Sequence, residues 1–285
     1  MRLSLVIPVY NEEDTIAACL EHVAAQIRPF DEVVVVDNNS TDATMEIVAS
    51  FADRLPLKTL QEPTPGVGPA RRSGFDAATG DILGRIDADT WLDPQWAGRL
   101  VRFFEAEPTT DAVSGSLYWY DTPVDERLRR LIRKDACRSL RTGSLPSTVL
   151  QGSNMAIRRE MWHKAKPHLL DQPGTHEDLD LYGAVVKAEG NVRSYVALTA
   201  AQSARRFAGP IGPNIAYARG GIRTYQLHGD AAAARNLRLA FPMNVTFCVI
   251  MRVLVGPFDP VTRKWRPFRG HHVVRVSPME GTRTA

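Results

Sequence analysis

Two short apolar runs, each followed by a helix-like segment, constrain the fold of this chain most. The runs cover residues 3–9 and 33–36 and are rich in valine and isoleucine. Continuous apolar runs of this length are typical of strands that are buried on both faces of a parallel sheet. Residues 14–26 and 42–52 carry apolar side chains at helical spacing. The order strand, helix, strand, helix predicts an α/β fold with right-handed crossovers.

The same pattern continues through the middle of the chain. Gly80 closes a predicted helix over residues 70–78, and an apolar run over 82–86 predicts another strand. We expect further helices over 91–107, 127–141 and 178–189, and a strand over 112–120. Beyond Gly209 the chain is rich in glycine and proline, and one alanine-rich helix is predicted over 230–239. We therefore expect a single α/β domain over residues 1–210, with a mostly parallel central sheet flanked by helices. A C-terminal extension over 211–285 should be helical and then irregular and basic.

Composition places the chain among ordinary globular proteins. Of its 285 residues, 44% are hydrophobic and 24% are charged. A formal charge of +3 is too small to indicate a nucleic-acid partner. From Arg252 onward, however, seven Arg or Lys residues face only Asp259 and Glu280. This basic tail suits anionic lipid headgroups or an anionic substrate, and a solvated tail explains it equally well.

The cysteines and the apolar stretches indicate the compartment. Cys19, Cys137 and Cys248 match no metal-binding or disulfide spacing, which favours a reducing compartment. The chain begins directly with a strand-like run, so we expect no signal peptide. The apolar stretch over 245–255 contains Arg252 and is shorter than the roughly 20 residues of a spanning helix. We expect a cytoplasmic protein, either free or in peripheral contact with the inner face of the membrane.

Polar side chains follow three of the predicted strands. The clusters are residues 8–12, 37–42 and 87–89, and the last contains two aspartates, Asp87 and Asp89. The carboxyl ends of parallel strands meet at one edge of the sheet. Paired carboxylates suit Mg²⁺ or Mn²⁺, with substrate phosphates completing the coordination. By itself, the 37–42 cluster is equally typical of a helix N-cap followed by a polar turn. Together the clusters predict a crevice for a base, a ribose and a metal-bound diphosphate.

Two common nucleotide-binding motifs are missing from the sequence. No Gly-x-x-x-x-Gly-Lys-[Ser/Thr] segment occurs, which argues against a P-loop protein. No Gly-x-Gly-x-x-Gly segment follows the first strand, which argues against a dinucleotide-binding fold.

Six segments, in order, resemble family 2 glycosyltransferases, which have the GT-A fold. The resemblance covers roughly residues 1–207. It implies a nucleotide-sugar-binding half over 1–115 and an acceptor half over 116–210. Processive members carry Gln-x-x-Arg-Trp, whereas this chain has Gln202-Ser203-Ala204-Arg205-Arg206-Phe207, so we favour an enzyme that adds one sugar at a time. The six segments are Pro8-Val9-Tyr10-Asn11-Glu12, residues 35–42 (Val-Val-Asp-Asn-Asn-Ser-Thr-Asp), Gly68-Pro69-Ala70-Arg71, Ile86-Asp87-Ala88-Asp89, residues 151–159 (Gln-Gly-Ser-Asn-Met-Ala-Ile-Arg-Arg) and His176-Glu177-Asp178-Leu179-Asp180.

The resemblance also implies how the donor is held. Asp89 should bind Mg²⁺ or Mn²⁺ directly, and Asp87 should hold the ribose or a metal-bound water. The metal would stabilise charge on the departing diphosphate. Arg205 or Arg206 could close over that diphosphate, because guanidinium groups pair well with phosphate oxygens. The remaining implied donor-binding residues are Pro8, Tyr10, Glu12 and Asp37, around the base and ribose, and Arg71, near the base or diphosphate.

In the acceptor half the resemblance points to Asp178 as the general base. Transfer to a hydroxyl needs a carboxylate that takes the proton as the oxygen attacks. Glu177 would support it, and both lie where a helix begins, a position that favours an ionised carboxylate. Ordinary placement of acidic residues in a first helical turn is the competing explanation. Asp180 would then be helix surface. Gly152, Ser153 and Asn154 are expected to line the sugar pocket, and His176 and His228 are weaker candidates to assist the metal.

The sequence thus predicts a metal-dependent, inverting glycosyltransferase that acts by direct displacement. The donor would be a nucleotide-diphosphate sugar, with a UDP-sugar favoured. The acceptor would be a glycan, a lipid-linked molecule or a small molecule, and no nucleic acid is expected. Two alternatives stay open. One is a sugar-phosphate nucleotidyltransferase, although residues 8–12 are not the glycine-rich loop that such enzymes carry after the first strand. The other is a catalytically silent nucleotide-sugar-binding protein.

Overall fold

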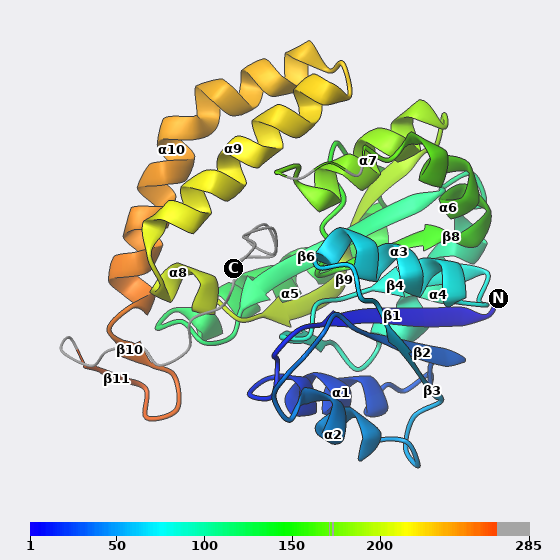
Figure 1. The fold of residues 1–285 in the computed structure, drawn as a ribbon, viewed down its shortest axis with the longest axis horizontal. Helices are drawn as coiled ribbons and strands as arrows, with labels where there is room; N and C mark the ends of the chain where they lie inside the picture. Colours follow the sequence, from blue (N-terminus) through cyan, green and yellow to red (C-terminus); the bar gives the residue numbers. More distant parts are fainter. Residues whose placement is uncertain (171, 173, 267–285) are drawn as a thin grey trace.

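One sheet forms the centre of the molecule, which a computed structural model describes over residues 1–170, 172 and 174–266 (Figure 1). Its strand order is β3-β2-β1-β4-β8-β6-β9-β5, and β7 pairs with β9. A separate two-stranded hairpin, β10–β11, follows the last helix. The strands are β1 Leu3–Val9, β2 Glu32–Asp37, β3 Leu57–Gln61, β4 Ile82–Arg85, β5 Thr90–Leu92, β6 Ala112–Trp119, β7 Leu145–Pro146, β8 Met155–Arg158, β9 Val192–Gln202, β10 Phe258–Asp259 and β11 Lys264–Trp265.

Helices cover both faces of the sheet and form the C-terminal part of the described chain (Figure 1). Helices α9 and α10 pack against each other as an antiparallel hairpin, and α9 also contacts α7. The helices are α1 Ile16–Ala24, α2 Thr44–Ala49, α3 Val67–Ala77, α4 Trp96–Ala106, α5 Asp125–Thr142, α6 Arg159–Ala165, the 3₁₀ turn η1 Lys166–His168, α7 Glu177–Lys187, α8 Arg205–Ala208, α9 Ile211–Leu227 and α10 Ala231–Val255.

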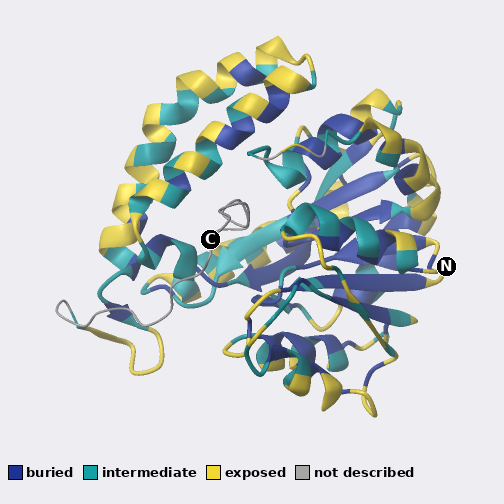
Figure 2. Ribbon diagram, viewed as in Figure 1, coloured by how far each residue is buried: buried dark blue, intermediate teal, exposed yellow. Residues whose placement is uncertain are grey.

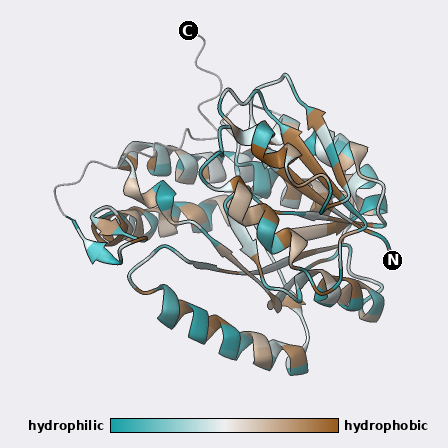
Figure 3. Ribbon diagram, turned by 90° about the horizontal axis from the view of Figure 1, so that it is seen from below, coloured by the Kyte–Doolittle hydropathy of each residue, from teal (hydrophilic) through white to brown (hydrophobic). Residues whose placement is uncertain are grey.

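Strands β1, β2 and β4 bury both of their faces, as their largely apolar sequences require, whereas the edge strand β3 is partly exposed. Leu5 and Ile7 of β1 pack in a core with α1 and α4, while Val6 packs on the opposite face with α3, α6 and α7. Figure 2 shows these strands as buried, and Figure 3 shows them as the hydrophobic centre of the molecule. This double burial confirms the predicted α/β fold.

Strand direction places the functional end of the sheet. The neighbours β3, β2, β1 and β4 are all parallel, with Val9 opposite Asp37 and Val6 opposite Arg85. The second half is mixed, because β8 runs antiparallel to both β4 and β6, whereas β6 and β9 are parallel. The carboxyl ends of β1, β2 and β4 therefore meet at one edge, as the sequence predicts.

One predicted helix starts five residues late. Residues 90–92 form strand β5, and helix α4 begins only at Trp96. The reason is Pro94, because the residue before a proline avoids the helical region. Trp91 instead stacks in the strand on Tyr120, with ring centroids 3.6 Å apart.

The C-terminal extension is more helical than the sequence predicts. The single helix expected over 230–239 is the first part of the 25-residue helix α10, and α9 was not expected at all. Glycine misled this prediction, because Gly221 lies inside α9, where an added Cβ would be 3.2 Å from Leu179 and 3.4 Å from Leu237. It serves close helix packing rather than a loop. The predicted basic tail beyond residue 266 lies outside the described residues.

The apolar stretch over 245–255 is part of the longer helix α10, so the expectation that it is too short to span a membrane is wrong. Within the described residues, α10 is long and apolar enough to cross a bilayer by length and composition, although such helices also occur in other settings.

A buried asparagine ties helix α4 to the second half of the sheet. The Asn154 side-chain amide donates to the carbonyls of Ser116 and Leu198, at 2.9 and 2.8 Å. Its oxygen accepts from the Trp96 indole N–H at 2.8 Å. Asn154 is completely buried, so these bonds are made inside the core.

Replacing Asn154 by alanine should lower the free energy of unfolding by roughly 2–4 kcal/mol, because the Trp96 indole N–H and two main-chain carbonyls lose their buried partner. Asn191→Ala is the matched control, since Asn191 is exposed and its amide donates to the Thr109 carbonyl. The control should change stability by less than about 1 kcal/mol. Urea unfolding followed by circular dichroism measures both values. Equal losses in the two variants would contradict the structural role of Asn154.

Candidate active site

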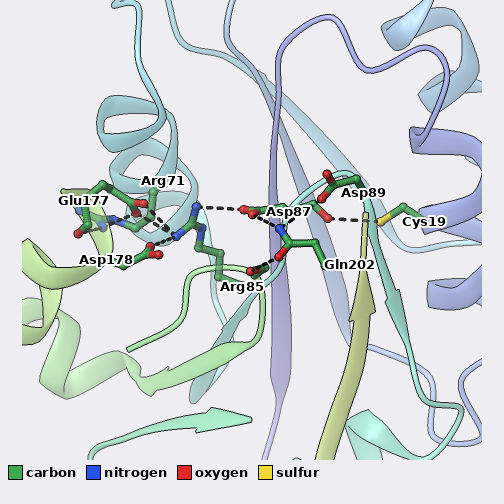
Figure 4. Close-up of polar contacts among 9 residues, drawn as sticks. Cys19, Arg71, Arg85, Asp87, Asp89, Glu177, Asp178 and Gln202 are labelled. Atoms are coloured by element: carbon green, nitrogen blue, oxygen red, sulfur yellow. Dashed lines mark hydrogen bonds and ion pairs between the residues drawn. The ribbon is translucent and has the colours of Figure 1, made fainter. Parts of the chain in front are cut away.

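A buried arginine, Arg85, joins the two halves of the candidate site. It is the last residue of β4, and its side chain is only 3% exposed. Its guanidinium donates to Asp178 at 2.8 Å, to Glu177 at 2.9 Å and to Asp87 at 3.1 Å. Figure 4 shows it between the carboxylates of α7 and the carboxylate that follows β4. The carboxylates predicted for the donor and acceptor halves therefore lie in one network.

The carboxylates around Arg85 keep its guanidinium charged despite its burial. Burial opposes the charge of Arg85, but Glu177, Asp87 and Asp178 outweigh it and raise its pKa above the ordinary value. Burial raises the pKa of Glu177, although Arg71 and Arg85 oppose this shift. Arg71, almost fully buried on α3, contacts the Glu177 carboxylate and donates to its main-chain carbonyl at 2.9 Å. Two guanidinium groups thus fix the first turn of α7.

Gly152 lies directly against this network. A Cβ built at that position would be 1.9 Å from a guanidinium nitrogen of Arg85 and 2.2 Å from Asp178 Oδ1. No other residue fits without moving one of these two side chains. Glycine at this position therefore allows the backbone to approach Arg85 and Asp178 closely.

Asp89 is the most deeply buried carboxylate of the site. Its side chain is fully buried and accepts from Arg205 Nε at 3.1 Å. Arg205 also contacts the Glu12 carboxylate, so one guanidinium joins the segment after β1 to the segment after β4. Gln202 Nε2 lies 3.0 Å from Asp87 and 3.4 Å from Asp89. Burial opposes the charge of Arg205, but Asp89 and Glu12 raise its pKa above the ordinary value.

The chemistry of Asp87 and Asp89 fits a divalent cation that also has phosphate ligands. Both offer carboxylate oxygens at the end of β4, and the side chains that face them are cationic or amide donors. No group of three or more His, Cys, Asp or Glu residues suited to a metal occurs within the described part of the chain. A cation here would therefore take its remaining ligands from substrate and water. Arg205 contacts Oδ2 of Asp89, and Oδ1 has the longer 3.4 Å contact to Gln202.

The other predicted donor-side residues lie at the same edge but do different things. Tyr10 is 44% exposed directly after β1. Asp37 Oδ1 accepts from the Ser40 main-chain N–H at 2.9 Å, which shapes the turn after β2. Pro8 lies within β1 opposite Val36.

Arg206 points away from the carboxylates. Its guanidinium lies 4.3 Å from the ring centroid of Tyr217 on α9, and Nε donates to Asn214. Of the two arginines, only Arg205 thus contacts the carboxylates of the donor side.

The acceptor-side residues separate into two groups. Ser153 donates to the Gln202 side chain at 3.1 Å and so stays beside the carboxylates. Asn154, expected in the sugar pocket, is instead in the core, because its polar atoms hold Trp96 and two carbonyls. Asp180, expected on the helix surface, is buried and accepts from the Leu170 N–H at 3.0 Å.

Neither candidate histidine lies among the aspartates that follow β4. His228 Nε2 is 2.8 Å from Asp180 Oδ1, and both side chains are buried. The His176 ring packs against Tyr217, with centroids 4.1 Å apart. These contacts connect α7 with α9 and give both histidines a packing role.

Three residues of the site were not selected as site residues from the sequence. Arg85 joins the two halves, Gln202 bridges Asp87 and Asp89, and Asp121 holds the segment before α8. Asp121 accepts from the Ala204 N–H at 2.6 Å and thereby positions the turn that presents Arg205. The available signal for Arg85 was an arginine inside an apolar strand, which is rare unless the charge is paired. Asp121 offered no such signal.

A model of glycosyl transferase family 2 matches residues 4–165, more than half of the chain. The chain belongs to this family. Curated relatives agree with this assignment, and they are named as glycosyltransferases. Glycosyltransferase AglE of Haloferax volcanii is 38% identical over 185 residues, which cover 61% of this chain and 59% of AglE. An uncharacterized glycosyltransferase of Nostoc sp., alr2836, is 28% identical over 178 residues, or 59% of this chain and 54% of the relative. The predicted family and the predicted class of enzyme are confirmed.

Solved structures show that the fold is the GT-A fold predicted for this glycosyltransferase. Mannosyltransferase PcManGT of Pyrobaculum calidifontis, in complex with GDP-Man and Mn²⁺, is similar with a TM-score of 0.64 at 22% identity, covering 88% of this chain and 73% of PcManGT. TarS 1–349 of S. aureus, in complex with UDP-GlcNAc, has a TM-score of 0.60 at 18% identity, covering 80% and 66%. At these identities the likeness concerns the fold alone. The chain spans only 29% to 59% of the length of the curated relatives that it matches most strongly.

His176 makes the stability of the fold depend on pH. Burial lowers its pKa from 6.5 to about 4, and its Nδ1 has no hydrogen-bond partner within the described structure. Below about pH 6.5 the unfolded chain binds a proton that the folded chain refuses until about pH 4. Stability should therefore fall as the pH drops through this window.

His176→Gln removes this titration. Between pH 7 and pH 5 the variant should lose less unfolding free energy than the wild type, by on the order of 1–2 kcal/mol. Urea unfolding at the two pH values measures the difference. His163→Gln, at an exposed position on α6, should behave as the wild type. An identical pH dependence in His176→Gln and wild type would contradict the prediction.

Proposed function

We propose that this glycosyltransferase moves a sugar from a nucleotide-diphosphate donor to an acceptor hydroxyl, with inversion and by direct displacement. The observation that carries the proposal is the position of Arg85, which contacts both Asp87 and Asp178. The general base and the diphosphate-binding site must lie on opposite sides of one anomeric carbon. Because one guanidinium lies between Asp87 and Asp178, the two carboxylates are close enough to flank such a carbon.

The donor is assigned to the carboxyl ends of β1, β2 and β4. The base and ribose would contact Tyr10 and Asp37, whose side chains follow adjacent parallel strands. Arg71 is committed to Glu177 in this structure, so we assign it to holding α7 and only indirectly to the donor. Arg205 would exchange its carboxylate partners for the diphosphate when the donor binds, because phosphate oxygens offer it the same charge-assisted bonds.

A divalent ion, Mg²⁺ or Mn²⁺, would be held by Asp89, with Asp87 reaching it through water or holding the ribose. When bound, such an ion stabilises the charge that develops on the leaving diphosphate. Two structural neighbours, PcManGT and GalNAc-T7, are complexes with Mn²⁺, which supports a divalent ion in this enzyme. The protein's own part is to hold the two carboxylates rigidly, through Arg85 and Gln202.

Asp178 is assigned the role of general base. It lies in the first turn of α7, is 18% exposed, and is held at Oδ1 by Arg85. Partial exposure allows an acceptor hydroxyl to reach it, while the arginine fixes its orientation. Gly152 lies beside it, Ser153 is bonded to Gln202, and both would limit the space for the transferred sugar.

Asp178→Asn should retain donor affinity within about twofold and lower turnover by at least about 100-fold, because the amide keeps the bond to Arg85 but cannot take a proton. Metal-dependent hydrolysis of the nucleotide sugar, with water as acceptor, measures turnover, and calorimetry measures affinity. Asp135→Asn, at an exposed position on α5, is the control and should leave both unchanged. Near-normal turnover in Asp178→Asn would exclude it as the base.

Asp89→Asn should lower the Mn²⁺-dependent affinity for the nucleoside diphosphate by at least about 10-fold, since one carboxylate ligand becomes an amide. Calorimetry with UDP and with GDP, in Mn²⁺ and in EDTA, measures the effect. Asp93→Asn is the control, because Asp93 pairs with Arg99 just after β5. Undiminished affinity in Asp89→Asn would show that the ligand lies elsewhere.

The donor base and the reaction class are decided by product analysis. Structural neighbours bind GDP-Man and UDP-GlcNAc, so both nucleotides belong in the screen beside dTDP-sugars. A UDP-sugar is our first choice. Release of free nucleoside diphosphate supports a transferase, whereas release of pyrophosphate would identify a nucleotidyltransferase, and no release would identify a silent binding protein.

We place this activity in the cytoplasm, at or near the inner face of the membrane. The free thiols of Cys19, Cys137 and Cys248 support a reducing compartment. The acceptor remains a glycan, a lipid-linked molecule or a small molecule, and no feature of the site favours nucleic acid.

A further inference from the structure

We propose that helix α10 and the β10–β11 hairpin dock this enzyme onto an anionic lipid surface, with α10 lying in the plane of the interface. The first observation is an exposed apolar stripe along α10. Its members follow one another at spacings of four, four, three and three residues, so they share one helix face. They are Leu239, 74% exposed, Met243, 69%, Phe247, 41%, Ile250, 51%, and Val253, 63%.

Most of the stripe is on the outer side of α10. Phe247 lies at its inner edge, where its ring centroid is 5.9 Å from that of Trp119 and 5.7 Å from that of Phe207. Ala234, Met251 and Val255 are the buried residues of this helix, and its inner side packs on α9 and α8. Figure 2 shows exposed residues along α10 over its whole length, while buried residues are more frequent along α9. Large apolar side chains concentrated on one outer face indicate an interaction surface.

The β10–β11 hairpin adds two more exposed apolar side chains. It follows α10 after Gly256 and carries Val261, 90% exposed, and Trp265, 51% exposed. Tryptophan is favoured at the boundary between headgroups and acyl chains. An exposed Trp and Val therefore follow the apolar helix in the chain.

The charges around the stripe indicate which kind of partner binds it. Between positions 231 and 266 the only acidic residue is Asp259, which forms an ion pair with Arg266. The cations of this segment are Arg235, Arg238, Arg252, Arg263, Lys264 and Arg266. Arg263 forms an ion pair with Asp125 of α5, and Arg252 donates to the Gly209 carbonyl, so Arg235 and Arg238 are the cations that lie along α10 outside these contacts. An apolar helix face bordered by arginines is the pattern of helices that lie on anionic membranes. A second copy of the chain fits less well, because a symmetric contact would bring the same arginines together from both copies.

Lying on the bilayer fits the structure better than crossing it. A spanning α10 would either leave α9 or draw α9 into the lipid with it. Helix α9 carries Arg219 and Arg223, and Arg219 lies 5.9 Å from the ring centroid of Phe241 on α10. Charged side chains in the hydrocarbon core are costly, whereas an interfacial helix keeps its polar side in water.

Docking of this kind would also favour a lipid-linked acceptor, a step that rests on the proposed function. The inner face of the α9–α10 helical hairpin contacts the proposed acceptor half. Tyr217 of α9 packs on His176, which lies two residues before Asp178. Lipid binding itself does not depend on catalysis. Failure to bind vesicles with intact donor hydrolysis would remove only the docking, and bound but inactive enzyme would count against only the proposed reaction.

Vesicle binding of the full chain tests the proposal. Co-sedimentation compares binding to vesicles of phosphatidylcholine with 30% phosphatidylglycerol and to vesicles of pure phosphatidylcholine. In 0.1 M NaCl the Debye screening length is roughly 10 Å, so charges near the membrane surface still attract each other. We expect at least 10-fold stronger binding to the anionic vesicles. The double variant Met243→Glu/Ile250→Glu should lose at least 10-fold of it. Ile27→Glu is the matched control, because Ile27 is 72% exposed and lies outside the C-terminal hairpin, and it should bind as the wild type.

Charge is tested separately with Arg235→Gln/Arg238→Gln, which should weaken binding several-fold at 0.1 M NaCl and much less at 0.5 M. Thermal unfolding within a few degrees of wild type confirms that each variant is folded. Light scattering without lipid should show a monomer. Equal binding to both vesicle types, or anionic binding that the Met243→Glu/Ile250→Glu variant retains, would overturn the proposal. A wild-type dimer that this variant converts to monomer would overturn it in favour of a second copy as the occupant.

Discussion

The rest of the site depends on the burial of one charged side chain, Arg85. A guanidinium removed from water is costly unless carboxylates surround it. Here the partners come from two parts of the chain, Asp87 after β4 and Glu177 and Asp178 at the start of α7. Because all three bonds come from one planar group, the start of α7 must sit beside the end of β4. The closeness of the proposed base to the proposed diphosphate site follows from this requirement.

The network continues as a row in which cationic or amide donors alternate with carboxylates. Arg205 lies at its far end, between Asp89 and Glu12. In such a row the proposed diphosphate would compete with the carboxylates for Arg205, because phosphate oxygens offer a guanidinium equivalent bonds. Such an exchange of partners would move one side chain near α8 while Arg85 keeps the framework in place.

The parallel half of the sheet and its polar strand ends could be predicted because local pattern determines them. Uninterrupted valine runs require double burial, and parallel strands then bring their ends together. The second half could not be predicted as well, because its contacts join residues distant in sequence. Asn154 is polar and lies two residues after a glycine, a pattern that also occurs in pockets, yet its partners are a tryptophan and two carbonyls reached only in the folded chain. Glycines in α9 likewise resemble a loop until the packed neighbours of Gly221 are known.

The α9–α10 hairpin shows why a chain would keep large apolar side chains in contact with water. Its inner side is specific: Tyr217 packs on His176, and Arg206 stacks on Tyr217, so α9 helps to shape the acceptor half. Its outer side makes no use of its apolar residues within the described chain, and their exposure lowers solubility. A face that only covered α9 would be equally stable with polar residues outside. Exposed Leu239 and Met243 are explained if this face also contacts the proposed lipid surface.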